Sequence, residues 1–244
     1  DWGWNNDWAP EAISKLKPEV GFMSVSEWDL PIERGGVKSN VGEYSLSSVG
    51  PGPRAQRHWE LANKVSGRSV LAKVQSNTSW EIGTVPYVPA VYLAAQHAVN
   101  LRKAKVNGLM LSWTLGGFPS PNLMAFDIAG TNPNLDVDSI VKMTAEKWTG
   151  SKKTEPFLKL WRGVSDAFQN YPYHIETLYN SPVQLGPANL LWLEPTGYHA
   201  TMAGFPYDDL RAWRGPYPSD VFASQMEKTA DGFQRAVEGC TKNS

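Results

Sequence analysis

The stretch VGFMSVSEWD, residues 20–29, joins a short apolar run to a cluster of two carboxylates and an indole. Two later stretches have the same order. The apolar run at 69–75 leads into polar residues that end at Glu81, and the run at 106–113 leads into a Gly-Gly loop. Short apolar runs bounded by polar residues predict buried β-strands. A fourth strand is predicted at residues 1–4, which resemble the last residues of a strand already under way.

Helical patterns lie between the predicted strands. Residues 53–65 begin with a proline and carry apolar positions at helical spacing. Residues 88–105 are rich in Ala and end in Lys and Arg, which suit the C-terminal end of a helix dipole. Strands that alternate with helices predict βα units and a parallel sheet.

About four such units are predicted, whereas a closed barrel needs eight. The predicted fold class is therefore α/β: the C-terminal part of a (β/α)8 (TIM-like) barrel followed by a helical tail. A small open sheet that is complete in itself is the alternative, but it leaves the first strand without a natural beginning.

The C-terminal part of the chain has a different pattern. Residues 136–148 begin with acidic side chains and carry Lys near their end, as a capped helix does. Residues 156–168 and 219–237 are also periodic, and stretches rich in Pro and Gly separate the helices. We therefore expect the βα units of a partial barrel at 1–130 and a mostly helical C-terminal extension at 131–244.

Composition and motifs exclude several classes of function. The net charge of −1 argues against a nucleic acid or an anionic membrane as partner. The single cysteine, Cys240, excludes a disulfide framework and a Cys-based zinc site. No run of about 18 apolar residues is present, so no membrane span is expected. The four histidines lack zinc-hydrolase spacing, and neither a G-x-S-x-G elbow nor a nucleotide-binding glycine motif is found. The sequence therefore predicts no metal and no organic cofactor.

Aromatic residues are unusually abundant, with 11 Trp, 9 Tyr and 8 Phe in 244 residues. Tryptophan tends to lie at sites with one wet edge, and the C–H faces of sugars stack on indole rings. Together with modest charge and many Gly and Pro residues, this composition is typical of carbohydrate-handling proteins. A carbohydrate is therefore the expected partner, and a large aromatic core is the alternative explanation.

The polar clusters that follow the predicted strands are the candidate site, because ligands bind at the carboxyl ends of parallel strands. Glu27 lies beside an indole, where partial desolvation raises the pKa of a carboxyl group toward the range of a general acid. Glu81 closes the second cluster, and these two glutamates are the candidate catalytic residues. The candidate substrate-binding residues are Trp28, Arg34, Glu43, Tyr44, Gln75, Asn77, Trp80 and Trp113.

The main candidates also have structural alternatives. Glu27 is an ordinary ionised residue if it pairs with Arg34 or Lys38, and Glu81 can belong to the cap of the following helix. Arg34, between Glu33 and two glycines, is a candidate for presenting its charge to an anion from a flexible loop. The indole before the Gly-Gly loop at 116–117 forms either the floor of a pocket or part of the core.

Three segments, SEWD at 26–29, NTSWE at 77–81 and LSWTLGGFPS at 111–120, resemble the strand-end motifs of glycoside hydrolases built on a (β/α)8 barrel. In particular, they are similar to the second half of large bacterial glycosidase-like proteins. The resemblance covers roughly residues 1–125. It implies hydrolysis of a glycosidic bond by a pair of carboxylates, without a metal or an organic cofactor. Two pairs stay open: the two candidate glutamates, or one of them with a carboxylate from a missing part of the barrel.

Two other functions stay open as well. A non-catalytic carbohydrate-binding or scaffold domain keeps the fold and the aromatic floor without an acid/base pair. A lyase or isomerase on the same barrel needs a base near neutrality, such as Lys73. The missing N-terminal part of the same barrel is an expected partner. Because glycan degraders are often exported, a periplasmic or extracellular location is favoured.

Overall fold

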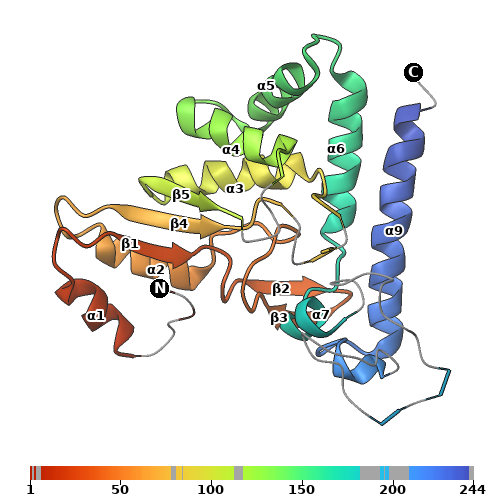
Figure 1. Cartoon of the computed structure of the whole chain (residues 1–244), viewed down its shortest axis with the longest axis horizontal. Helices are drawn as coiled ribbons and strands as arrows, with labels where there is room; N and C mark the ends of the chain where they lie inside the picture. Colours follow the sequence, from red (N-terminus) through yellow and green to blue (C-terminus); the bar gives the residue numbers. More distant parts are fainter. Residues whose placement is uncertain are drawn as a thin grey trace.

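The computed structural model describes residues 1, 3, 7–77, 81–83, 85–112, 118–181, 193–194, 196–197 and 209–241. This part of the chain is a mixed α/β structure with a three-stranded parallel sheet, a two-stranded hairpin and eight α-helices (Figure 1). The strands are β1 (Phe22–Val25), β2 (Pro31–Arg34), β3 (Val37–Asn40), β4 (Val70–Val74) and β5 (Gly108–Leu111). The helices are α1 (Ala9–Lys15), α2 (Pro53–Ala62), α3 (Val91–Lys103), α4 (Pro121–Thr131), α5 (Val137–Thr149), α6 (Glu155–Phe168), α7 (Ile175–Asn180), the short 3-10 helix η2 (Leu210–Ala212) and α9 (Ser219–Thr241).

The parallel sheet has the strand order β1-β4-β5, which is also the order of these strands along the chain. On one face of β4, Val70, Ala72 and Val74 are fully buried in an apolar cluster that includes residues of α2 and α3. On the other face, Leu71 is partly exposed, and Met110 of β5 is 45% exposed. The apolar side chains of β4 are therefore buried more completely on the first face, whereas β5 is partly exposed on both faces, since Leu109, beside Ala72, is 37% exposed.

The predicted βα pattern is confirmed in its central part. The strands predicted at the start of 20–29, at 69–75 and at 106–113 are β1, β4 and β5. The helices predicted at 53–65 and 88–105 are α2 and α3. The described residues form an α/β structure with three parallel strands and no closed barrel.

The strand predicted at residues 1–4 is not found in the described part of the chain. Asp1 and Gly3 are described, and neither is in a strand. The terminal ammonium of Asp1 donates to the carbonyl of Met23 in β1 at 2.6 Å. The Asp1 carboxylate bonds to Arg54 and His58 of α2 at 2.8 and 2.7 Å. Individual bonds to β1, including one from the Ser24 hydroxyl at 2.8 Å, and side-chain contacts with α2 therefore hold this residue without a β-ladder.

The hairpin of β2 and β3 was not predicted. Its two-residue turn consists of Gly35 and Gly36, whose φ angles are 57° and 80°. A two-residue turn with two positive φ angles matches the twist of a β-hairpin, and glycine adopts it without steric cost. Arg34 pairs with Val37 next to this turn. Arg34 therefore belongs to a strand and not to the flexible loop that the two glycines suggested.

The predicted helical tail is confirmed, with α5, α6 and α9 near the expected positions. Asp136 caps α5 by accepting the backbone N–H of Ser139 at 2.8 Å, as its place before the helix predicted. Trp161 of α6 and Ala236 of α9 belong to the same apolar cluster as the sheet, so both parts of the chain contribute to one core. No helix in the part of the chain described here is long and apolar enough to cross a lipid bilayer.

Two glycines allow α6 and α9 to lie close together, side by side (Figure 1). A Cβ atom added to Gly163 of α6 would lie 2.8 Å from the Cβ of Ala236. A Cβ atom added to Gly232 of α9 would lie 2.4 Å from the Cβ of Ala167. Both distances are too short for carbon atoms in van der Waals contact, so the spacing of the two helices depends on these glycines.

Gly232→Ala is therefore expected to force α9 away from α6 and to lower the free energy of unfolding by about 1–3 kcal/mol, the usual cost of overpacking. Gly239→Ala in the same helix is the matched control. Its Cβ would lie an ordinary 3.5 Å from the side chain of Lys159, and alanine is favoured over glycine in a helix by up to about 1 kcal/mol. Urea unfolding compares the two variants. Equal stability of both would contradict the close packing of α6 and α9.

Candidate functional site

Glu27 lies two residues beyond β1, at the carboxyl edge of the parallel sheet. The Ser26 amide continues the ladder by donating to the Lys73 carbonyl at 2.9 Å. The chain then turns, and the Leu30 amide donates to the Glu27 carbonyl at 3.0 Å. Asp29 in this turn has a φ of 64°, a left-handed conformation that is uncommon for a residue other than glycine. The Glu27 side chain is fully buried at this position.

The two oxygens of the Glu27 carboxyl group have different surroundings. Oε1 accepts the backbone N–H of Gln75 at 3.3 Å and lies 3.5 Å from Nδ1 of His97. Oε2 is buried, and no polar atom of the described residues bonds to it. Burial raises the pKa of Glu27 well above its ordinary value and the charge of Glu81 adds to this, while the Gln75 N–H and Lys73 oppose it. Glu27 therefore keeps its proton at a pH where an exposed glutamate has lost it.

Lys73 of β4 brings a buried cation close to Glu27. Its ammonium donates to the carbonyl of Ser112 at 3.2 Å and lies 5.4 Å from the centre of the Tyr44 ring, within the range of a cation–π contact. Burial lowers the pKa of Lys73, and the charges of Glu27 and Glu43 oppose this shift. Burial raises the pKa of Tyr44, and the same two carboxylates raise it further. Glu27, Glu43, Tyr44 and Lys73 thus interact electrostatically, and we call them the carboxylate cluster.

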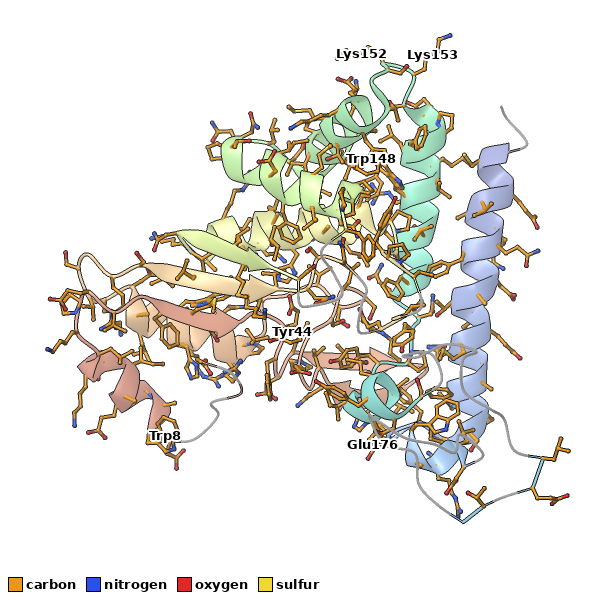
Figure 2. All side chains as sticks on the ribbon, in the orientation of Figure 1. Trp8, Tyr44, Trp148, Lys152, Lys153 and Glu176 are labelled. Carbon is orange, nitrogen blue, oxygen red and sulfur yellow. The ribbon has the colours of Figure 1, made fainter. Side chains whose placement is uncertain are left out.

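Residues of the C-terminal tail hold Glu43, which is buried in the loop after β3. The hydroxyl of Tyr179 in α7 donates to Oε2 of Glu43. The hydroxyl of Tyr173 accepts the backbone N–H of Glu43 at 3.3 Å. Figure 2 shows the next residue, Tyr44, near the ends of β1 and β4. The helical tail therefore takes part in the carboxylate cluster.

Glu81 is fully buried and bonded to the loop that follows Glu43. Its carboxylate accepts the hydroxyls of Ser45 at 2.8 Å and Ser47 at 2.5 Å, and the backbone N–H groups of Leu46 at 2.7 Å and Ser47 at 3.1 Å. Buried backbone N–H groups require an acceptor, which Glu81 supplies here. Burial raises the pKa of Glu81, and these four donors oppose the shift. Because donors occupy both oxygens, the contacts of Glu81 suit anchoring of the loop better than proton exchange with a substrate.

Arg34 and Trp28, two predicted substrate-binding residues, make contacts with other side chains of the protein. The Arg34 guanidinium donates to the hydroxyl of Ser48 at 2.9 Å and to the carbonyl of Ser47 at 3.3 Å. Arg34 therefore supports the same loop as Glu81. The Trp28 ring lies 5.7 Å from the guanidinium carbon of Arg54, so it contacts α2.

Gln75 and Asn77, two more predicted contacts, are buried just beyond β4. The side-chain amide of Gln75 donates to the carbonyl of Asn77. The Asn77 side chain accepts the hydroxyl of Ser120 at 2.6 Å and donates to the carbonyl of Phe118 at 2.9 Å. Asn77 therefore joins the end of β4 to the start of α4, which Ser120 caps.

The aromatic platform that the sequence predicts cannot be placed, because Trp80 and Trp113 lie outside the described residues. Ser112, directly before Trp113, is described and has a φ of 63°. Its hydroxyl bonds to that of Ser76 at 2.6 Å and accepts the N–H of Asn77 at 3.0 Å. A strained backbone held by surrounding hydrogen bonds is commonest at functional sites. The contact of Trp80 and Trp113 with a sugar stays a prediction.

Three residues beside the predicted glutamates were not singled out from the sequence: His97, Tyr173 and Tyr179. His97 lies inside an Ala-rich helix, where a histidine is more often a packing or surface residue. The two tyrosines lie 130 and 136 residues from Glu43 in the chain. No local signal marks any of the three, because the fold alone brings them to the carboxylate cluster.

Within the described residues, no group of three or more His, Cys, Asp or Glu side chains lies close enough together to hold a metal ion. Comparisons with protein-family models, with curated proteins and with solved structures found no match. The chemistry of the carboxylate cluster is therefore the basis for a functional proposal.

Proposed function

We propose that this protein is a glycoside hydrolase that acts through two carboxylates, with Glu27 as the general acid. One observation carries the proposal: the Glu27 carboxyl group is fully buried, its pKa is raised, and Oε2 has no partner among the described residues. A general acid needs a proton that it retains near neutral pH and an oxygen that is not already bonded within the protein. The carboxyl edge of a parallel sheet, where Glu27 lies, is also where sites occur in α/β proteins.

The proposal assigns the second carboxylate to Glu43 rather than to Glu81. The charges of Glu43 and Glu27 both raise the pKa values of Lys73 and Tyr44, so the two carboxylates lie in the same group of side chains. Both oxygens of Glu81, in contrast, accept hydrogen bonds from the loop at 45–47. Glu27 gives its proton to the glycosidic oxygen as the bond to the anomeric carbon breaks. Glu43 attacks that carbon, or takes a proton from the water that attacks it. The positive charge of Lys73 favours the ionised form of Glu43 that either role requires.

Release of reducing ends from a panel of oligosaccharides and aryl glycosides tests the proposal. Hydrolysis that depends on Glu27 supports it. Binding of a glycan without hydrolysis favours the alternative of a non-catalytic carbohydrate-binding domain, which the abundance of Trp supports. Elimination or isomerisation of a sugar substrate that is lost in Lys73→Met favours a lyase or isomerase with Lys73 as its base, an alternative that the lowered pKa of this buried amine supports.

We also propose that the α/β sheet is part of a (β/α)8 barrel, and the strand order supports this. Crossovers between parallel strands are right-handed, so the order β1-β4-β5 puts α2 and α3 on the same face of the sheet. In a doubly wound sheet the order reverses and helices cover both faces. In this proposal an N-terminal part of the same barrel pairs with the outer edges of β1 and β5.

A partial barrel is expected to unfold in a broad transition and to bind a dye for exposed apolar surface. The reason is that, in this proposal, the face of β5 that carries Met110, which is 45% exposed, is covered only in the whole barrel. Thermal and urea unfolding of the 244-residue chain with such a dye measures both properties. A single cooperative transition without dye binding would contradict the partial barrel.

A further inference from the structure

Three buried side chains lie in a row that ends at the Glu27 carboxyl group: Ser26 is hydrogen-bonded to His97, and His97 lies beside Glu27. The hydroxyl of Ser26 lies 2.7 Å from Nε2 of His97, and the other ring nitrogen of His97, Nδ1, lies 3.5 Å from Oε1 of Glu27. All three side chains are buried. We propose that Ser26 and His97 hold the Glu27 carboxyl group so that the proton it transfers is carried on Oε2. This inference rests on the proposed function and makes His97 a positioning residue.

The hydrogen-bonding capacities of the partners set the direction of the chain. Burial lowers the pKa of His97 to about 3, so its ring is neutral at pH 7 and carries one N–H. When Nε2 accepts the Ser26 hydroxyl, the ring proton is on Nδ1 and faces Oε1 of Glu27. The Gln75 backbone N–H, which can only donate, reaches the same oxygen at 3.3 Å. Two donors make Oε1 the accepting oxygen, which leaves Oε2 to carry the acid proton.

The opposite ring tautomer agrees less well with these contacts. It would turn the lone pair of Nδ1 toward Oε1, and the Glu27 proton would have to lie on that oxygen. The Gln75 N–H would then donate to the hydroxyl oxygen of the carboxyl group, a weaker acceptor than its carbonyl oxygen, and the buried carbonyl oxygen Oε2 would have no donor among the described residues. The first tautomer gives every donor around Oε1 an acceptor.

Packing holds the His97 ring in its orientation. A Cβ atom on Gly50 would lie 2.7 Å from Nε2 of His97 and 2.8 Å from the hydroxyl oxygen of Ser26, so the backbone closes directly over this hydrogen bond. On another side, the ring of Phe126 meets the His97 ring edge to face at a centroid distance of 6.1 Å. The chain from Ser26 to Glu27 is therefore enclosed by protein.

Two substitutions of His97 separate its two contacts. His97→Asn keeps an amide N–H near the position of Nδ1, whereas His97→Gln places its amide near Nε2 and loses the donor to Glu27. Loss of a donor to the ionised carboxylate raises the pKa of Glu27. His97→Gln is therefore expected to move the titration of the Glu27 carboxyl group to higher pH, and His97→Asn is expected to leave it near that of the wild type.

Infrared difference spectra of the carboxyl groups measure this titration without any substrate, and subtraction of the Glu27→Gln spectrum isolates the signal of Glu27. Lys73 from β4, Tyr44 from the loop after β3, Glu81 and Tyr173 also interact electrostatically with Glu27, and Glu43 acts on Lys73, Tyr44 and Tyr173 in turn. These groups are the same in all the His97 variants, so a difference between the variants reports on His97.

In hydrolysis, His97→Gln is expected to lower kcat by about 10²-fold, the scale of a misplaced catalytic group. The basic limb of kcat/KM, which reports loss of the Glu27 proton, is expected to move upward in pH, and His97→Asn is expected to restore most of the activity. If His97→Gln does not fold, Ser26→Ala removes only the hydroxyl that fixes the tautomer, and the same upward shift is expected.

The outcomes separate this inference from the proposed function. A titration shift in a protein that hydrolyses no glycan would uphold the placement of the proton and reject the glycosidase. Identical titration of Glu27 in the wild type, in His97→Asn and in His97→Gln or Ser26→Ala would overturn the inference, whatever the activity.

Discussion

Glu27→Gln is expected to lower the rate of glycoside hydrolysis by about 10³-fold, within the range that general acid catalysis contributes. The glutamine amide keeps an oxygen for the Gln75 N–H but has no proton to transfer, so binding of the substrate is expected to change little. The loss is expected to be largest for substrates whose leaving group needs protonation. Measurements of kcat and KM compare the wild type, Glu27→Gln and the exposed control Glu60→Gln on α2. Unchanged kcat in Glu27→Gln would remove Glu27 from the mechanism.

The free energy of unfolding of Glu27→Gln is expected to increase relative to that of the wild type as the pH rises. The pKa of Glu27 in the folded protein lies above the ordinary 4.5, so the folded protein holds this proton more tightly than the unfolded chain does. The contribution of Glu27 to stability is therefore fully present below about pH 4.5 and decreases as the pH rises toward the folded pKa. For one proton the slope is at most about 1.4 kcal/mol per pH unit. Glu27→Gln removes this slope.

Urea unfolding of the wild type and Glu27→Gln at pH 4 and pH 8 measures the effect. A larger advantage of the variant at pH 8 would also show that its lost activity is not a consequence of unfolding. The same stability difference at both pH values would mean that the pKa of Glu27 is not raised in the folded protein.

Glu81→Ala is expected to lower the free energy of unfolding by about 3–5 kcal/mol, because several buried hydrogen-bond donors lose their shared acceptor. The substitution leaves the hydroxyls of Ser45 and Ser47 and the backbone N–H groups of Leu46 and Ser47 without their acceptor. Each buried donor without an acceptor costs about 1–3 kcal/mol. Hydrolysis is expected to fall as well, because the adjoining residue Glu43 would lose its fixed position.

Glu19→Ala is the control for this variant, because Glu19 is exposed and surface substitutions usually change stability by less than about 0.5 kcal/mol. Glu81→Gln keeps one acceptor oxygen and is expected to lose less stability than Glu81→Ala. Urea unfolding ranks the three variants. A Glu81→Ala protein as stable as Glu19→Ala would show that the loop at 43–48 does not depend on Glu81.

The place of Glu27 at the end of a strand could be predicted because it depends on a local pattern. An apolar run of four to seven residues is buried as a strand, and the polar residues that follow it then lie at the carboxyl edge of the sheet. The same reasoning located β4, β5 and the helices α2, α3, α5, α6 and α9. It failed for the hairpin, although Gly35 and Gly36 are a hairpin signal, because the short strands beside them have few apolar residues.

The role of Glu81 could not be predicted in the same way. A carboxylate after a strand predicts a residue at the edge of the sheet, but not what its oxygens contact. Its four donors lie 34 to 36 residues earlier in the chain, in a loop whose burial has no sequence signal. Arg34, placed by the sequence in a flexible loop, supports this same loop from β2.

By itself, the sequence determined the alternation of strands and helices, the helical tail and the strand end that carries Glu27. Only the tertiary structure decided that His97 meets Ser26 across 71 residues and that Tyr179 meets Glu43 across 136. The physical reason is the range of the forces involved. Periodicity and capping act over a few neighbouring residues, whereas the pKa and hydrogen bonds of a buried carboxyl group depend on atoms within a few ångströms, whichever part of the chain supplies them.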